Sequence, residues 1–186
     1  RGLGDVYKRQ VYNHTYATAD SPFNKIFNKY YYRLWGENGE YFSNGSGCGN
    51  EIATERFMVR KYIIDSLVYW ATEYKIDGFR FDLMGLYDIE TMNKIDETLH
   101  AINPDIILYG EGWIGGDSPL ADSKRAMKLN ARHTPNIAFF SDDFRDTIKG
   151  NNFENRSRGY VNGATGSEEY VKEVMCGRIP PPQIPN

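Results

Sequence analysis

The chain has 186 residues, enough for one sizeable core but fewer than the roughly 250 residues of a complete eight-stranded α/β barrel. Its 22 basic and 25 acidic residues give a formal net charge of −3 without a basic block, so nucleic acid is not an expected partner. No apolar run approaches the ~18 residues of a membrane span, and two distant cysteines make no disulfide framework. We therefore expect a soluble protein without a membrane partner, and the compartment, cytoplasmic or secreted, stays open.

The first ten residues, RGLGDVYKRQ, are charged, lack a clear period and run abruptly into VYNHT at residues 11–15. We interpret residues 1–10 as a non-native or misread leader and leave them out of the expected fold. Residues 23–50 are rich in Tyr, Asn and Gly and read as a long irregular segment. Loops of that length are usually functional.

Helical and strand patterns alternate from there on. Thr54 is expected to cap a helix through Tyr74, with an apolar face made of Phe57, Ile64, Leu67, Val68 and Ala71. The next expected elements are a strand at 76–83, a helix opened by Asp88 and ended by Asn103-Pro104, a strand at 106–112, a weaker helix at 123–130, a strand at 137–140 and a short helix stopped by Gly150. This alternation predicts an α/β fold with a parallel sheet and helical crossovers.

Two acidic residues stand at the carboxyl ends of neighbouring expected strands. In KIDGFRFDLMG (75–85), Arg80 and Asp82 share one face of a strand and two phenylalanines share the other. Glu111 ends the next strand, so in a parallel sheet Asp82 and Glu111 face the same rim. Paired carboxylates of this kind are typical of glycoside hydrolysis, in which one attacks the anomeric carbon and the other protonates the leaving oxygen.

The neighbours of these acids suggest a division of roles. Arg80 would keep Asp82 ionised, as a nucleophile requires, and the apolar Trp113 would favour the protonated form of Glu111, as an acid requires. Taken alone, DGFRFD also fits a structural Arg–Asp pair, and a glutamate between two glycines is often a turn. His14 alone is more often a hydrogen-bonded core histidine, and Trp113 is either a core residue or a sugar platform.

Three segments, VYNHT (11–15), DGFRFD (77–82) and GEGW (110–113), resemble in this order the first three sequence motifs of the α-amylase superfamily, glycoside hydrolase family thirteen. Residues 44–85 look like the type I pullulanases, a group of α-1,6 debranching enzymes. The resemblance implies that residues 11–177 are part of a catalytic (β/α)8 barrel, a partial TIM barrel from roughly the end of strand three through strand six. Residues 178–186 are then expected to be an unstructured, truncated tail.

The resemblance also implies roles for individual residues. Asp82 matches the catalytic nucleophile, Glu111 the general acid/base and Arg80 the partner of the nucleophile. His14 matches a histidine that hydrogen-bonds the sugar in the subsite being cleaved, and Tyr12 matches a stacking platform beneath that sugar.

Two further residues complete the expected site. Trp113 is a candidate for substrate binding. Asn13 matches an asparagine that binds structural calcium in many amylases. We expect that no cofactor is required, and calcium at Asn13 is the alternative.

The implied activity is that of a retaining glycoside hydrolase acting on α-1,6-glucosidic linkages in pullulan, starch or glycogen, with an α-glucan as partner. The sequence departs from the family pattern in two places. Arg9 stands where the first motif has an aspartate, and the fourth motif, with the third catalytic carboxylate, is expected beyond Asn186. This chain alone is therefore predicted to be inactive. The alternatives are another superfamily enzyme, an α-1,4 amylase or isoamylase, or a non-catalytic glucan-binding relative.

Overall fold

The computed structural model describes residues 7–152 and 154–176 of the chain. They fall into two compact units, which divide between Phe139 and Phe140. The expected tail at 178–186 and the first six residues of the expected leader lie outside the described residues.

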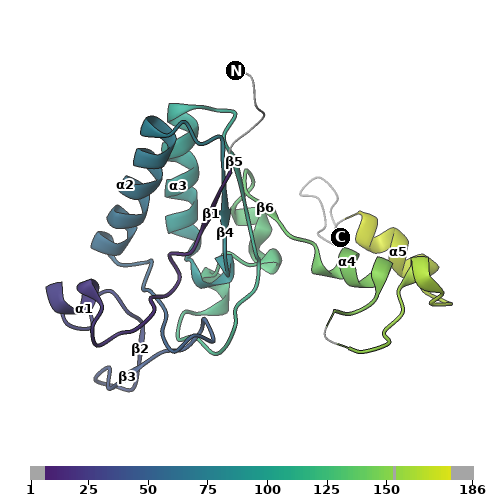
Figure 1. Cartoon of the computed structure of the whole chain (residues 1–186), viewed down its shortest axis with the longest axis horizontal. Helices are drawn as coiled ribbons and strands as arrows, with labels where there is room; N and C mark the ends of the chain where they lie inside the picture. Colours follow the sequence, from purple (N-terminus) through teal and green to yellow (C-terminus); the bar gives the residue numbers. More distant parts are fainter. Residues whose placement is uncertain (1–6, 153, 177–186) are drawn as a thin grey trace. The chain divides into compact units, whose positions relative to one another are not determined.

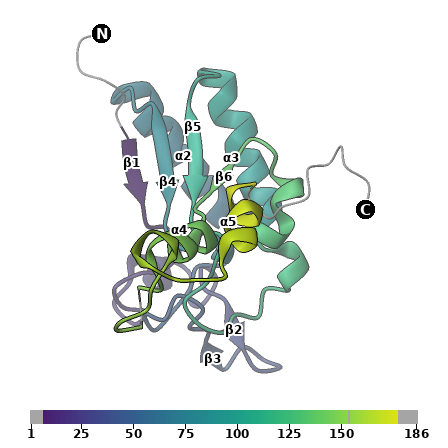
Figure 2. The ribbon, with the colours of Figure 1, turned by 90° about the vertical axis from the view of Figure 1, so that its right-hand side faces the viewer.

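The first unit is built on a parallel sheet. Its strands, in spatial order, are β1 (Tyr7–Gln10), β4 (Gly78–Phe81), β5 (Ile107–Gly110) and β6 (Ala138–Phe139). Helices α2 (Phe57–Glu73) and α3 (Ile89–Ile102) lie side by side on one face of this sheet (Figures 1 and 2). The parallel order confirms the expected α/β class, and over the described residues the sheet is open rather than closed into a barrel.

Strand β1 falls within the segment that we left out of the expected fold. Residues 7–10 pair in register with residues 78–81 of β4, and the Lys8 ammonium lies 3.8 Å from the centre of the Trp70 ring on α2. The exclusion of residues 7–10 from the fold was therefore wrong. A strand of four residues presents only two side chains to each face, so the sequence shows no period there. The origin of residues 1–10 stays a prediction.

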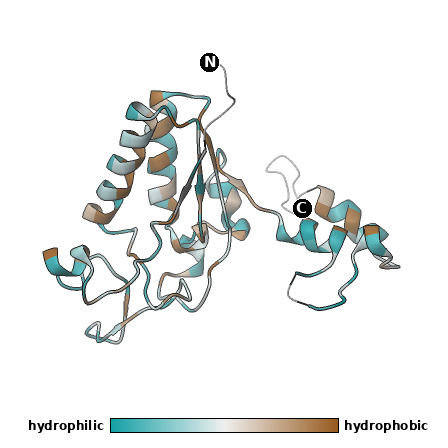
Figure 3. Cartoon of the chain, viewed as in Figure 1, coloured by the Kyte–Doolittle hydropathy of each residue, from teal (hydrophilic) through white to brown (hydrophobic). Residues whose placement is uncertain are grey.

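The side chains of β4 alternate as the sequence predicts. Phe79 and Phe81 are fully buried in the core beneath the helices, whereas Arg80 between them is only partly buried. Burying a phenylalanine side chain contributes about 1.5–3 kcal/mol, so the two rings hold this strand firmly against α2 and α3. Brown, hydrophobic segments and teal, hydrophilic segments follow one another along both helices, as expected for helices with one buried side (Figure 3).

Helix α2 begins later than expected and buries a different stripe. Its N-cap is Arg56, because the Thr54 hydroxyl instead hydrogen-bonds the Asp88 carboxylate at 2.7 Å. Phe57, predicted to lie in the core, is 73% exposed. The buried residues of α2 are Val59, Ile63, Leu67 and Ala71. Two adjacent apolar stripes share Leu67 and Ala71, and the sequence alone does not show which stripe meets the sheet.

Helix α3 agrees with the sequence. The Asp88 side chain caps it by accepting a hydrogen bond from the Thr91 amide at 2.9 Å, and Asn103 follows its last residue. The weaker helix expected at 123–130 was wrong, since two 3₁₀ helices, η2 (Asp122–Lys124) and η3 (Lys128–His133), occupy the region. Between them Arg125 forms an antiparallel bridge with Asp88, which interrupts any continuous α-helix.

The segment between β1 and α2 is largely irregular, as expected from its composition. It contains the short helix α1 (Pro22–Ile26) and an antiparallel pair of strands, β2 (Leu34–Trp35) and β3 (Tyr41–Phe42). A 3₁₀ helix, η1 (Met84–Leu86), separates β4 from α3.

The second unit is helical, with α4 (Asp142–Lys149), the 3₁₀ helix η4 (Tyr160–Asn162) and α5 (Glu168–Met175). The Ser141 hydroxyl caps α4 by accepting from the Phe144 amide at 3.2 Å, and the helix stops at Gly150, whose φ of 96° suits glycine. Among the described residues, no helix combines the length and the apolar character that a membrane crossing needs.

Candidate active site

The two predicted carboxylates meet at one guanidinium group. Asp82 follows β4 and Glu111 follows the adjacent parallel strand β5. Arg80 Nη1 lies 3.5 Å from Asp82 Oδ1, and Arg80 Nη2 forms an ion pair with Glu111 Oε1. The three side chains are 15–20% exposed, so they are accessible from solvent while lying mostly inside the protein. The structure thus brings together the residues predicted to do the chemistry.

Glu111 has two hydrogen-bond donors around its carboxylate. Besides the Arg80 contact, Glu111 Oε2 accepts a hydrogen bond from the Leu83 amide at 3.0 Å. Leu83 has a φ of 41°, a left-handed conformation that costs roughly 1–2 kcal/mol for a residue with a side chain. This strained residue directly follows Asp82, and its amide holds the second carboxylate beside the first.

Trp113 lies two residues after Glu111, and its contact with substrate stays a prediction. Its described contact is through the backbone, where its carbonyl accepts from the Gly85 amide at 3.2 Å. Glu111 itself has polar donors at both carboxylate oxygens.

Asn13 joins the end of β1 to the nucleophile candidate. It is fully buried, and its Nδ2 donates to the Asp82 backbone carbonyl at 2.6 Å and to Asp82 Oδ2 at 3.2 Å. Its Oδ1 contacts His14 Nδ1. The Asn13 amide therefore fixes both the Asp82 carboxylate and the orientation of the His14 ring.

The residues around Asn13 do not fit a calcium site. Calcium takes about six to eight oxygen ligands. The Asn13 oxygen already faces a ring nitrogen of His14, and the described residues contain no cluster of three or more His, Cys, Asp or Glu suited to a metal ion.

Tyr12 lies in a different layer from the carboxylates. Its hydroxyl is 2.6 Å from Ser66 Oγ and its ring packs edge-on against Tyr62, with both partners on α2. Burial raises the pKa of the Tyr12 hydroxyl to about 12. Successive residues of an extended chain point to opposite sides, so when Asn13 faces Asp82, Tyr12 faces the helices. This placement does not fit a sugar platform beside the carboxylates.

Tyr87 is a supporting residue that the sequence did not single out. It is fully buried, packs edge-on against Phe81, and its hydroxyl accepts a hydrogen bond from the Tyr12 amide at 3.2 Å. Burial raises the pKa of the Tyr87 hydroxyl far above its usual range, and the nearby Asp82 charge acts in the same direction. No local pattern marks a tyrosine one residue before a helix cap as part of a site.

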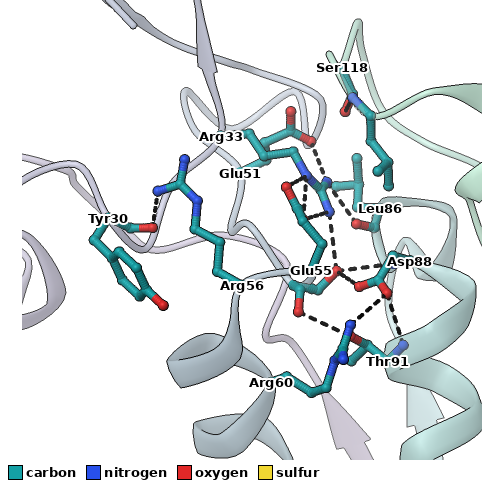
Figure 4. Close-up of polar contacts among 12 residues, drawn as sticks. Tyr30, Arg33, Glu51, Glu55, Arg56, Arg60, Leu86, Asp88, Thr91 and Ser118 are labelled. Carbon is teal, nitrogen blue, oxygen red and sulfur yellow. Dashed lines mark hydrogen bonds and ion pairs between the residues drawn. The ribbon is translucent and has the colours of Figure 1, made fainter.

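A buried ionic network supports the segment that follows Asp82 (Figure 4). Arg33 is 3% exposed and pairs with Glu51, which is fully buried, and with Glu55 at 2.8 Å. It also donates to the Leu86 carbonyl at 2.8 Å. The nearby Thr54 hydroxyl bonds both the carboxylate and the amide of Asp88. The network therefore ties the irregular segment to the connection between β4 and α3.

Replacing Arg33 with methionine should destabilise the full-length parent protein by about 3–5 kcal/mol, because Glu51 would remain buried without its cation. Urea unfolding of the parent measures this change. The double variant Arg33→Met/Glu51→Gln should recover part of it, and the exposed control Arg132→Met should stay within about 0.5 kcal/mol. Equal stability of Arg33→Met and its control would contradict the prediction.

Three cavities bordered by described residues are not lined by the two carboxylates. One of about 820 Å³ lies beside the network, between the starts of α2 and α3 and residues 119–124, and neither Asp82 nor Glu111 lines it. A smaller one of about 150 Å³ borders Tyr12 and His14. The candidate site lies where the two carboxylates converge at strand ends, the position that loops from all eight strands enclose in a complete barrel.

Comparisons with known proteins identify relatives of this chain. No protein-family model matches the chain. It is 44% identical over 167 residues to the pullulanase of Bacillus subtilis (strain 168), a match that covers 90% of this chain and 22% of that protein. It superimposes with a TM-score of 0.88 and 45% identity on the pullulanase of Anoxybacillus sp. LM18-11 complexed with maltotetraose, covering 93% of this chain and 25% of that one. The pullulanase of Paenibacillus barengoltzii, in complex with maltohexaose and alpha-cyclodextrin, superimposes with a TM-score of 0.88 and 44% identity. This match covers 94% of this chain and 27% of that one.

The similarity to these pullulanases places the chain in the α-amylase superfamily, a class that fits its parallel α/β sheet with acidic residues at adjacent strand ends. Within that superfamily the chain belongs to the type I pullulanase-like group. It spans about a quarter or less of the length of the relatives named above.

Proposed function

We propose that the protein to which this chain belongs is a retaining α-glucan debranching hydrolase that cleaves α-1,6-glucosidic linkages in pullulan, starch or glycogen. The observation that carries this proposal is the meeting of Asp82 and Glu111 at Arg80, at the ends of adjacent parallel strands. The bound maltotetraose of the Anoxybacillus relative supports an α-glucan as the partner.

In this reaction Asp82 attacks the anomeric carbon and forms a β-glycosyl-enzyme intermediate, while Glu111 protonates the departing sugar oxygen. Glu111 then takes a proton from water, which attacks the same carbon and releases product with the α configuration retained. The mechanism requires carboxyl groups about 5 to 5.5 Å apart in the complex with substrate. A common contact with one guanidinium keeps both groups on the same side of the sheet.

The ion pair between Glu111 and Arg80 has a consequence for the first step. Glu111 accepts hydrogen bonds at both oxygens, whereas protonation of the leaving group requires a Glu111 O–H that points at the glycosidic oxygen. We propose that substrate displaces at least one of these donors, so that this O–H can reach the glycosidic oxygen. Arg80 then remains with Asp82, the group that has to stay ionised.

The other predicted site residues divide into two groups. His14 is proposed to bind the sugar, with its ring oriented by Asn13, and Trp113 remains a candidate for substrate contact. Tyr12 is left out of the sugar-binding residues because its side chain packs against α2. No cofactor is proposed, since two carboxylates in opposite protonation states suffice for hydrolysis.

We further propose that the sheet corresponds to strands three through six of an eight-stranded barrel, which other segments of the parent complete. The parallel strand order and the similarity to much longer pullulanases support this assignment. A third carboxylate is proposed to come from outside this chain, and for that reason the chain alone is expected to be inactive.

Product analysis with the full-length parent tests the function. Cleavage of pullulan at its α-1,6 bonds releases maltotriose, and proton NMR of the first product should show the α-anomer. Cleavage at α-1,4 bonds would favour an amylase, and activity confined to branched glucans would favour an isoamylase. Glucan binding without hydrolysis would favour a non-catalytic relative, and an initial β-anomer would refute retention.

A further inference from the structure

The Gly-rich loop, residues 44–50 (NGSGCGN), contacts the site segments from outside the sheet. At one end, Asn50 is 2% exposed, and both polar atoms of its side chain form hydrogen bonds with the backbone of Thr15. Its Oδ1 accepts from the Thr15 amide at 2.9 Å, and its Nδ2 donates to the Thr15 carbonyl at 2.8 Å. Thr15 directly follows His14, so this amide fixes the backbone that carries the histidine.

The other end of the Gly-rich loop contacts the chain beyond Glu111. The Gly45 carbonyl accepts hydrogen bonds from the amides of both Gly115 and Gly116 at 2.9 Å. The approach is close, because a β-carbon on Gly115 would lie 2.4 Å from the Ser46 carbonyl oxygen. A residue with a side chain at position 115 would therefore separate the two segments.

The Gly-rich loop is also braced internally. The Gly49 amide donates to Asn44 Oδ1 at 2.5 Å, and the Cys48 amide donates to Ser46 Oγ at 3.0 Å. A braced loop transmits a displacement at one end to the other. This matters because β4 lies between β1 and β5, so no strand pair directly joins the segment after β1, which carries His14, to the segment after β5, which carries Glu111.

We propose that Asn50 is a positioning residue that acts through His14, and that the Gly-rich loop sets the spacing between the His14 segment and the segment after Glu111. The inference rests on the proposed function, because it assumes that His14 contacts the sugar. Losing the Asn50 amide removes two hydrogen bonds from the Thr15 backbone, so the segment that carries His14 can shift even though Asn13 still contacts the ring. A displacement of about 1 Å in a positioning group can lower a rate about 100-fold.

A double-mutant cycle in the full-length parent tests the proposal. Asn50→Ala should lower kcat/KM on pullulan about 10- to 100-fold. In a His14→Gln background the same change should cost less than about 3-fold, because the group through which Asn50 acts is already gone. A purely structural role would give the same fold-loss in both backgrounds, which would overturn the proposal, as would an unaltered kcat/KM in Asn50→Ala.

A conservative variant and a matched control complete the test. Asn50→Asp preserves the volume and the acceptor for the Thr15 amide but removes the donor to the Thr15 carbonyl, so it should show the same dependence on His14 even if Asn50→Ala folds poorly. Asn38→Asp is the matched control, since Asn38 is exposed and its side chain bonds Glu40 within its own turn. It should behave as the unaltered parent, and a loss equal to that of Asn50→Asp would contradict the assignment.

Affinity for maltotriose, measured by calorimetry over the same cycle, separates this inference from the proposed function. The affinity measurement does not require hydrolysis of the ligand. An unaltered parent that does not hydrolyse pullulan would refute the proposed function, while the cycle in affinity would still decide whether Asn50 acts through His14. Weaker maltotriose binding in Asn50→Ala that disappears in the His14→Gln background supports the inference, and equal weakening in both backgrounds rejects it.

Discussion

Replacing Asp82 with asparagine in the full-length parent should lower kcat on pullulan by about 10⁴-fold or more, because the amide cannot form the glycosyl-enzyme bond. Glucan binding should survive. Asparagine has the same shape, and its one carbonyl oxygen can keep one of the two contacts that Asp82 makes through separate oxygens, with Asn13 or with Arg80. The measurements are kcat on pullulan and the affinity for maltotriose by calorimetry.

The matched control for this change is Asp65→Asn. Asp65 is a 61% exposed residue of α2 that pairs with Lys61, away from the site. Its variant should retain full activity. If Asp82→Asn turned pullulan over at the rate of this control, Asp82 would not be the nucleophile.

Glu111→Gln has the second-largest expected effect. Removing a general acid/base typically costs 10² to 10⁴ in rate, so kcat on pullulan should fall by about that factor. The loss should be much smaller with a glucosyl fluoride, because fluoride departs without a proton. The exposed control Glu97→Gln, on the outer face of α3, should match the parent on both substrates.

The contrast between the two substrates identifies the role of Glu111. A nucleophile variant loses activity equally on both, because each requires the covalent step, whereas an acid/base variant regains its first step with the better leaving group. Equal losses of Glu111→Gln on pullulan and on the fluoride would contradict its assignment as the acid.

Azide separates the roles independently. In an Asp82→Gly variant azide can replace the missing nucleophile and give a glycosyl azide of inverted, β configuration. In a Glu111→Ala variant azide instead attacks the glycosyl-enzyme and gives the α product. NMR of the isolated azides distinguishes them, and the opposite pattern would exchange the two assignments.

The sequence by itself determined the features that depend on local order. Alternation of Phe79, Arg80 and Phe81 predicted which side of β4 is buried, and the positions of Asp82 and Glu111 at successive strand ends predicted that they meet. A parallel sheet converts strand order into spatial order, so these predictions needed no long-range information. The cap at Asp88 was equally local.

Tertiary structure decided how separate segments pack. In the folded structure the Tyr12 side chain packs against α2, and the Thr54 hydroxyl bonds Asp88 instead of capping α2. Strand β1 pairs with β4. The fold also brings Asn50 to Thr15, a contact that joins residues 35 positions apart. Each of these outcomes depends on which of several chemically acceptable partners lies within reach once the core has formed. Periodicity and short motifs carry no such information, because they describe neighbours along the chain and not neighbours in space.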